Sequence, residues 1–193
     1  MTRTNKLIEA FNQLSREAQK AVDYIVNVIS DYDNAVLSSE FFSNVLLIEN
    51  YKYNPHPTGD LKSSTWGRKG VYVFIVSEDY ILKPEEVAKY SAISGAGFWD
   101  APLKQCLKKG DHFYQGSTIR KSLHTRLKEH YSDECDQAGI KLNNKNRIIM
   151  KDRVKVFVFP IRKELECYHF FIRLIESRLH EEYPAKSGSK KTF

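Results

Sequence analysis

The sequence contains few cysteines, and they are not arranged for a disulfide framework or a structural zinc site. The three in 193 residues, Cys106, Cys135 and Cys167, are odd in number, widely spaced and free of any CxxC pair. Zinc sites and small disulfide-bonded domains need paired or clustered thiols. We therefore expect isolated free thiols.

Long apolar runs are also missing. The longest spans only a handful of residues, and the N-terminus carries early positive charges without the apolar core of a signal peptide. A membrane-spanning helix needs about 20 mostly apolar residues, so we expect no membrane partner. Together these absences favour a cytoplasmic protein. The 41% hydrophobic and 12% aromatic residues are enough to form a core, which excludes a wholly disordered chain.

Positive charge is concentrated in the second part of the chain. Residues 1–60 contain 5 Lys/Arg against 8 Asp/Glu, and residues 61–193 contain 25 against 16. Clustered basic side chains favour a polyanion partner, because neutralised phosphates release counterions; the alternative is a solvated basic surface without a partner. The candidate contacts are Lys104, Lys108, Lys109, Arg120, Lys121, Lys141, Lys145, Arg147, Lys151, Arg153 and Lys186.

The apolar pattern predicts helices first and then a mixture of strands and helices. Helical spacing runs from Leu7 to Ile29, and its long apolar face must pack on the rest of the chain or on a second copy of it. The other predicted helices are 38–49, 100–109, a basic helix through Leu123, Leu127 and Tyr131, and 164–183. The predicted strands are 70–76, 112–115 and 154–161, and irregular loops are predicted at 51–69 and 138–148. This order predicts an α+β fold with a small mixed or antiparallel three-stranded sheet flanked by helices.

Five sequence features occur in an order that resembles the GIY-YIG nuclease superfamily. They are "GVY" (70–72), "YQG" (114–116), Arg126 in "RLKEH", a third strand, and Glu176 in a helix that ends before Pro184. The resemblance implies a nuclease core at 69–188 with an insertion at about 77–111. A helical extension for packing or oligomerisation would then occupy 1–60, and a short basic tail 189–193.

The resemblance also implies a role for each site residue. Tyr72 and Tyr114 would direct their hydroxyls into one site, with Tyr72 accepting a proton from the attacking water. Arg126 would hold the scissile phosphate, and His130 would assist proton transfer. Glu176 would bind the single divalent cation, normally Mg²⁺, which Mn²⁺ can replace.

The residue types suit this chemistry without the family name. Phosphodiester hydrolysis needs a base for water, positive charge on the transition state and help for the leaving oxygen. A guanidinium grips two phosphate oxygens, and Mg²⁺ needs few protein ligands. An unperturbed tyrosine titrates near ~10, so Tyr72 needs nearby positive charge. Arg126 and His130, four residues apart, lie on one helix face and can supply it.

Several assignments stay open at this stage. Taken singly, the two tyrosines are typical core aromatics, and Arg126 and His130 are typical solvated side chains. Arg120 is a rival for the phosphate, and Glu176 could instead form a salt bridge to Arg173 or Arg178. Ser187, beside Lys186, stands where the superfamily commonly has an Asn after the final Pro, and Gln115 replaces the usual Ile or Val of the second tripeptide.

Among members of the superfamily, the chain most resembles type II restriction endonucleases. It is short, with extra helices in front and an insertion inside, which implies double-stranded DNA as substrate. A palindromic target would favour a homodimer or higher homo-oligomer. One alternative is a catalytically inactive nucleic-acid-binding module with the same fold. Another is an unrelated α+β domain, in which Tyr72, Tyr114 and Glu176 would lie far apart.

Overall fold

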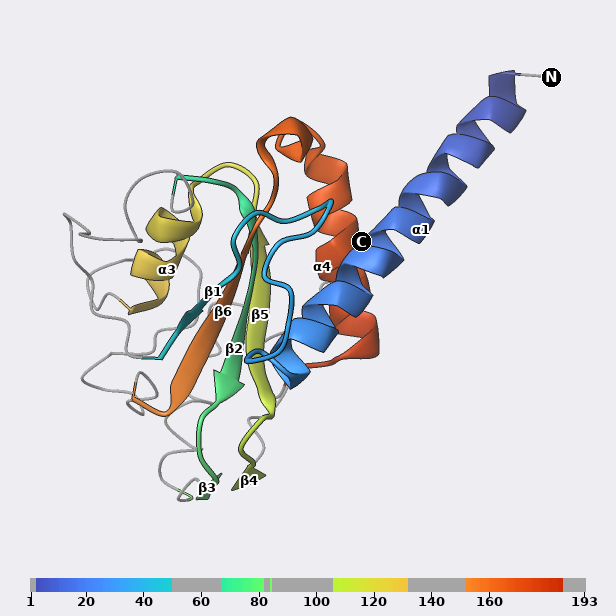
Figure 1. Ribbon diagram of the computed structural model, residues 1–193. Helices are drawn as coiled ribbons and strands as arrows, with labels where there is room; N and C mark the ends of the chain where they lie inside the picture. The colour runs from blue at the N-terminus through green and yellow to red at the C-terminus, as the bar shows by residue number, and fades with distance from the viewer. Residues whose placement is uncertain (1–2, 50–66, 82–83, 85–105, 132–151, 186–193) are drawn as a thin grey trace.

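The computed structural model describes residues 3–49, 67–81, 84, 106–131 and 152–185. These residues form helices and antiparallel sheets (Figure 1), which confirms the predicted α+β class. In chain order the elements are α1 (Arg3–Ser30), β1 (Leu46–Ile48), β2 (Gly70–Val76), β3 (Tyr80–Ile81), β4 (Cys106–Leu107), β5 (His112–Thr118), α3 (Leu123–Tyr131), β6 (Val154–Pro160), the short 3-10 helix η3 (Lys163–Leu165) and α4 (His169–Glu182).

The main sheet has four strands in the order β1-β6-β2-β5, all antiparallel. The three predicted strands are present as β2, β5 and β6, with β2 in the middle. Tyr72 lies opposite Gly116 on one side and opposite Val158 on the other. The predicted strand number was too low, because the three-residue strand β1 pairs with β6 and adds a fourth strand.

The segment that supplies β1 was predicted as a helix at 38–49, and that prediction is wrong. The Ser39 hydroxyl accepts hydrogen bonds from the backbone N–H groups of Phe41 and Phe42, which makes a turn. Asn44 adopts a positive φ of 40°, which ends any right-handed helix. Phe41 and Phe42 are nevertheless buried, so the apolar spacing reflected core packing rather than a helix.

Two further helix boundaries differ from the sequence predictions. The structure describes residues 106–109 of the predicted helix 100–109; they are not helical, and Cys106 and Leu107 form strand β4, which pairs with β3. The helix predicted at 164–183 begins only at His169, because the preceding residues form η3. The loops predicted at 51–69 and 138–148 and the basic tail lie wholly or mostly outside the described residues.

The described chain contains free, exposed thiols at Cys106 and Cys167, whereas Cys135 lies outside the described residues. Among the helices that the structure describes, none combines the length and apolar character needed to cross a membrane.

The two faces of the sheet are covered by different helices (Figure 1). Alternating residues of a strand point to opposite faces. Val71 and Val73 therefore pack with α1 and α4, whereas Tyr72 and Phe74 pack with Leu127 of α3. Every residue of β2 is buried, as expected for a central strand covered on both sides. This arrangement places Tyr72 beneath α3.

Helix α1 shares a core with the sheet only through its C-terminal half. From Ala18 onward its apolar face is buried against α4 and the sheet. The N-terminal half projects from the body (Figure 1), and Leu7, Ile8 and Phe11 are 65%, 54% and 53% exposed. The apolar face of α1 therefore extends beyond the part of the sheet and of α4 that the helix covers.

Candidate active site

Two tyrosines from neighbouring strands lie on the α3 face of the sheet. In the ladder between β2 and β5, Tyr72 faces Gly116 and Phe74 faces Tyr114, so both tyrosine side chains point to the same face. Their ring centroids are 6.4 Å apart. Tyr72 is buried and Tyr114 is partly buried, and both line one cavity. The unrelated-domain alternative predicted that Tyr72, Tyr114 and Glu176 would lie far apart, whereas all three line this cavity.

The glycines of the two tripeptides lie where neighbouring atoms leave no room for a side chain. A Cβ on Gly70 would lie 2.2 Å from the carbonyl oxygen of Phe159. A Cβ on Gly116 would lie 2.6 Å from the hydroxyl oxygen of Tyr72. Gly116 thus provides the space that the Tyr72 hydroxyl occupies.

We predict that Gly116→Ala lowers the free energy of unfolding by about 1–3 kcal/mol, as overpacking typically does. The closest atom is the Tyr72 hydroxyl, so the loss should be smaller when the substitution is made in a Tyr72→Phe background. Urea unfolding of the two single variants and the double variant measures this coupling. Equal losses in both backgrounds would show that the hydroxyl is not the obstacle.

Helix α3 brings Arg126 and His130 to the Tyr72 hydroxyl. Ser122 caps the helix, since its hydroxyl accepts a hydrogen bond from the backbone N–H of Thr125. One turn apart on the buried side, Arg126 Nε donates to Tyr72 Oη at 3.2 Å, and His130 Nε2 lies 2.9 Å from the same oxygen. The predicted proximity of these three side chains is therefore confirmed.

The environment of Tyr72 holds it in its neutral form. Burial raises the pKa of the Tyr72 phenol well above its usual range, and the nearby Tyr114 adds to the rise. The guanidinium of Arg126 acts in the opposite direction but does not cancel the effect of burial. Burial likewise raises the pKa of Tyr114. Before it can act as a base, Tyr72 must therefore pass its proton to a neighbour.

Glu176 reaches the same cavity from α4, around the edge strand β5. Its carboxylate is buried, and Oε2 accepts hydrogen bonds from Ser117 Oγ at 2.7 Å and from Arg173 Nη1 at 2.6 Å. Of the two salt-bridge partners considered from sequence, Arg173 is the one present. Arg178 instead binds Ser15 and Gln19 of α1.

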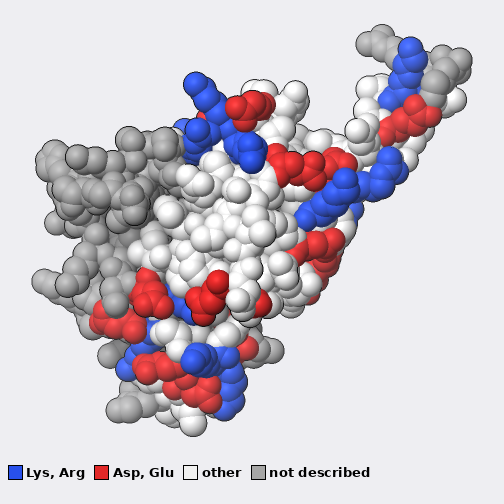
Figure 2. Space-filling model, viewed as in Figure 1, with Lys and Arg blue, Asp and Glu red and all other residues white. Residues whose placement is uncertain are grey.

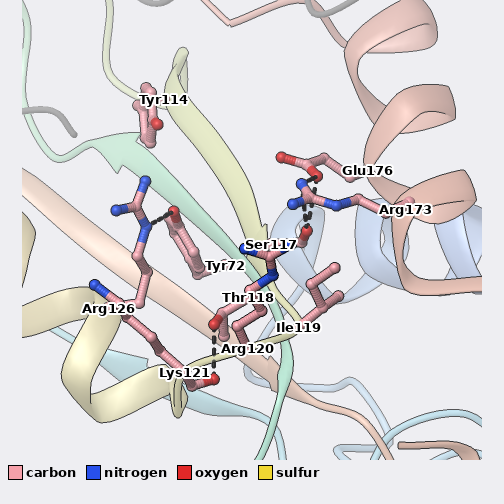
Figure 3. Close-up of a pocket in the computed structure, with 10 residues that line it drawn as sticks. All are labelled: Tyr72, Tyr114, Ser117, Thr118, Ile119, Arg120, Lys121, Arg126, Arg173 and Glu176. Atoms are coloured by element: carbon pink, nitrogen blue, oxygen red, sulfur yellow. Dashed lines mark hydrogen bonds and ion pairs between the residues drawn. The ribbon is translucent and has the colours of Figure 1, made fainter. Parts of the chain in front are cut away.

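The cavity between these groups holds about 400 Å³ and is lined mainly by polar side chains (Figure 3). Glu176 is the only carboxylate among its described lining residues, against four cationic side chains, so the cavity suits an anionic ligand. The lining residues are Tyr72, Tyr114, Ser117, Thr118, Ile119, Arg120, Lys121, Arg126, Arg173 and Glu176. Ser117 and Arg173 were not predicted as site residues. Ser117 directly follows "YQG", and Arg173 precedes Glu176 by about one helical turn.

A second carboxylate, Glu129, pairs with two of the cavity-lining cations and was missed from the sequence. It is buried on α3, accepts a hydrogen bond from Arg126 Nη1 at 2.8 Å, and pairs with the Lys121 ammonium. Burial would raise the pKa of Glu129, but the hydrogen bonds from Lys121 and Arg126 outweigh it and lower that pKa. Glu129 therefore fixes the guanidinium that contacts Tyr72.

We predict that Glu129→Gln lowers the free energy of unfolding by about 1–3 kcal/mol at neutral pH, because a partly buried Arg126 charge loses its partner. A lowered folded-state pKa contributes stability that is present above the unfolded pKa, near ~4.3, and lost as the pH falls through the folded value. The gap between wild type and variant should therefore close in acid. Urea unfolding from pH 7 to 3 measures it, with the exposed Glu181→Gln as control.

The predicted basic contacts fall into two described groups. Arg120 and Lys121 line the cavity. Lys108, Lys109 and Arg153 lie at the stem formed by the paired strands β3 and β4. Lys108 and Lys109 contact Asp79, and the Arg153 guanidinium lies 3.4 Å from the centroid of the Tyr80 ring. The others, Lys104, Lys141, Lys145, Arg147, Lys151 and Lys186, and also Ser187, lie outside the described residues.

Glu176 is the candidate metal ligand among the described residues that line the cavity. In the part of the chain that is described, no cluster of three His, Cys, Asp or Glu side chains exists. One carboxylate beside a hydroxyl suits Mg²⁺, which keeps most of its waters and binds through one or two carboxylates.

Comparisons with protein-family models, curated proteins and solved structures gave no match to this chain.

Proposed function

We propose that this protein is a metal-dependent endonuclease of the GIY-YIG type that hydrolyses phosphodiester bonds of double-stranded DNA. One observation carries the proposal: Arg126 and His130 both contact the Tyr72 hydroxyl. Tyr72 and Arg126 line one side of a cationic cavity, and Glu176 lines the other (Figure 3). These are the residues to which the resemblance to GIY-YIG nucleases gives roles in the reaction. The four-stranded sheet, with β2 between β5 and β6, is compatible with that core.

In the proposed reaction, Tyr72 takes a proton from the attacking water. Its own proton moves to His130 Nε2, 2.9 Å away, when that nitrogen carries the lone pair. The transfer leaves a neutral phenol and an imidazolium, so no free phenolate accumulates in the buried site. This relay accommodates the raised pKa of Tyr72, which would otherwise oppose its use as a base.

Arg126 is the better candidate for the phosphate clamp, with Arg120 as the alternative. Glu129 orients the Arg126 guanidinium, and Tyr72 accepts a hydrogen bond from its Nε. A guanidinium fixed beforehand stabilises transition-state charge more effectively than one that must be ordered. Arg120 lines the same cavity but is exposed. We assign it to contact the DNA backbone away from the scissile phosphate.

Glu176 would hold the divalent cation, with Ser117 beside it. When bound, Mg²⁺ or Mn²⁺ would stabilise negative charge on the phosphate and the leaving oxygen. The other proposed roles belong to the protein itself: Arg126 holds the phosphate, Tyr72 takes a proton from the water, and His130 receives the proton of Tyr72.

We further propose that the enzyme is a sequence-specific restriction endonuclease. The test is incubation of the protein with long duplex DNA and Mg²⁺, analysed on a gel. Discrete fragments are the expected result. Random degradation would support a nuclease without sequence specificity. Binding without cleavage in Mg²⁺, Mn²⁺ or Co²⁺ would instead favour the inactive binding module, with RNA as the next ligand to test.

The projecting half of α1 is our candidate for a homodimer contact. Leu7, Ile8 and Phe11 are exposed, and Phe11 contacts the half-exposed Phe170 of α4. Figure 2 shows acidic and basic side chains beside uncharged surface along this part of the helix. A two-fold axis would bury this surface against its copy and bring two cavities to the two strands of a palindromic target.

We predict that Phe11→Glu converts a dimer to a monomer in sedimentation velocity, because a charge would replace an apolar contact at the centre of the exposed face. Ile81→Glu is the matched control, since Ile81 is 75% exposed but lies in β3. A monomeric wild type, or a Phe11→Glu variant that remains dimeric, would contradict the proposed interface.

A further inference from the structure

Arg173 and the proposed metal ion compete for the same carboxylate oxygen. Arg173 Nη1 lies 2.6 Å from Glu176 Oε2, the oxygen that also accepts the Ser117 hydrogen bond. A carboxylate already paired with a guanidinium attracts a divalent cation less strongly, because its charge is offset. The protein without DNA therefore holds Glu176 in a state of low affinity for metal.

The Arg173 side chain has room to move, and a phosphate in the cavity would give it another partner. Its side chain is 32% exposed, whereas that of Glu176 is 5% exposed, so the guanidinium can leave the carboxylate while the carboxylate stays in place. Arg173 lines the same cavity as Arg126 (Figure 3). A phosphate entering this cavity would offer two oxygens to the guanidinium in place of one carboxylate oxygen.

We propose that Arg173 is a positioning residue that couples metal binding to DNA binding. Without DNA it neutralises Glu176, and when DNA binds it turns to a backbone phosphate and leaves the carboxylate to the cation. The inference rests on the proposed function, because it assigns the cation to Glu176. It adds that metal and DNA each strengthen binding of the other, as reciprocal coupling requires.

The test measures binding rather than cleavage. Mn²⁺ affinity is determined by electron paramagnetic resonance for wild type, Arg173→Gln and Glu176→Gln, with and without a short DNA duplex made uncleavable by phosphorothioate linkages. We expect DNA to raise the Mn²⁺ affinity of wild type about tenfold or more. Arg173→Gln should bind Mn²⁺ about tenfold more tightly than wild type without DNA, and DNA should then raise its affinity far less.

Arg178→Gln is the matched control, because it removes the same charge from α4 at a side chain that binds α1. It should behave like wild type. Equal DNA-induced increases in wild type and Arg173→Gln would overturn the coupling while leaving Glu176 as a metal ligand. Mn²⁺ binding that Glu176→Gln leaves intact would overturn both the coupling and the proposed metal site.

Discussion

Glu176→Gln is expected to reduce cleavage of duplex DNA in Mg²⁺ by roughly 10³-fold or more, because an amide replaces the only carboxylate among the described cavity-lining residues. The change keeps the shape of the side chain and its ability to accept a hydrogen bond from Ser117. Folding should therefore survive. Single-turnover cleavage rates measure the loss, and DNA binding in Ca²⁺ shows whether the variant still recognises its target.

The controls for Glu176→Gln come from the same cavity. Arg126→Ala should lose cleavage by about 10²–10³-fold, as expected when one preorganised cation is removed. Arg120→Ala should mainly weaken DNA binding and reduce its salt dependence. If Arg120→Ala were the more severe change in cleavage rate, the phosphate clamp would belong to Arg120. Full activity of Glu176→Gln would refute the proposed metal site.

Tyr72→Phe is the second change with a large expected effect. It removes one hydroxyl, the atom that Arg126 Nε and His130 Nε2 both contact. We expect the cleavage rate to fall by about 10²–10⁴-fold, the usual contribution of a general base, with little change in DNA affinity. Tyr114→Phe is the matched control on the neighbouring strand, and a smaller loss there would distinguish the two tyrosines.

The raised pKa of Tyr72 gives the same variant a second readout. A raised folded-state pKa contributes stability that is fully present below the unfolded value, near ~10, and lost as the pH rises through the folded value. Wild type should therefore lose stability above about pH 10, and Tyr72→Phe should lose less. Urea unfolding between pH 8 and 11 measures the difference. Identical alkaline profiles would show that Tyr72 does not keep its proton by burial.

The sequence predicted the features that depend on short-range pattern. The apolar runs at 70–76 and 154–161 became strands β2 and β6, and helical spacing placed α1 and α4. The spacing of Arg126 and His130 placed them on one face of α3, and the structure shows that this face meets Tyr72. These predictions succeeded because 3.6-residue and 2-residue periods are set by local geometry.

The features that were missed depend on contacts across the fold. Phe41 and Phe42 have apolar neighbours at helical spacing, but Phe42 pairs with Ile161 beside the sheet and both rings are buried in the core, which no local pattern reveals. Glu129 pairs with Lys121 outside its helix as well as with Arg126, and Ser117 acquires its importance from Glu176 and Arg173 on α4. Because ion pairs form between side chains of opposite charge wherever the fold brings them together, spacing alone cannot select the partner.

The pairing of β3 with β4 has a consequence for how this chain can be altered. Tyr80 faces Leu107 and Ile81 faces Cys106, so the chain departs from the sheet and returns to it through one narrow stem. The described residues that line the cavity belong to β2, β5, α3, α4 and the segment that joins β5 to α3. Lengthening a closed loop adds little entropic cost, about 0.6 kcal/mol per doubling. We therefore expect the β3–β4 stem to tolerate a change in the length of the chain between Ile81 and Cys106.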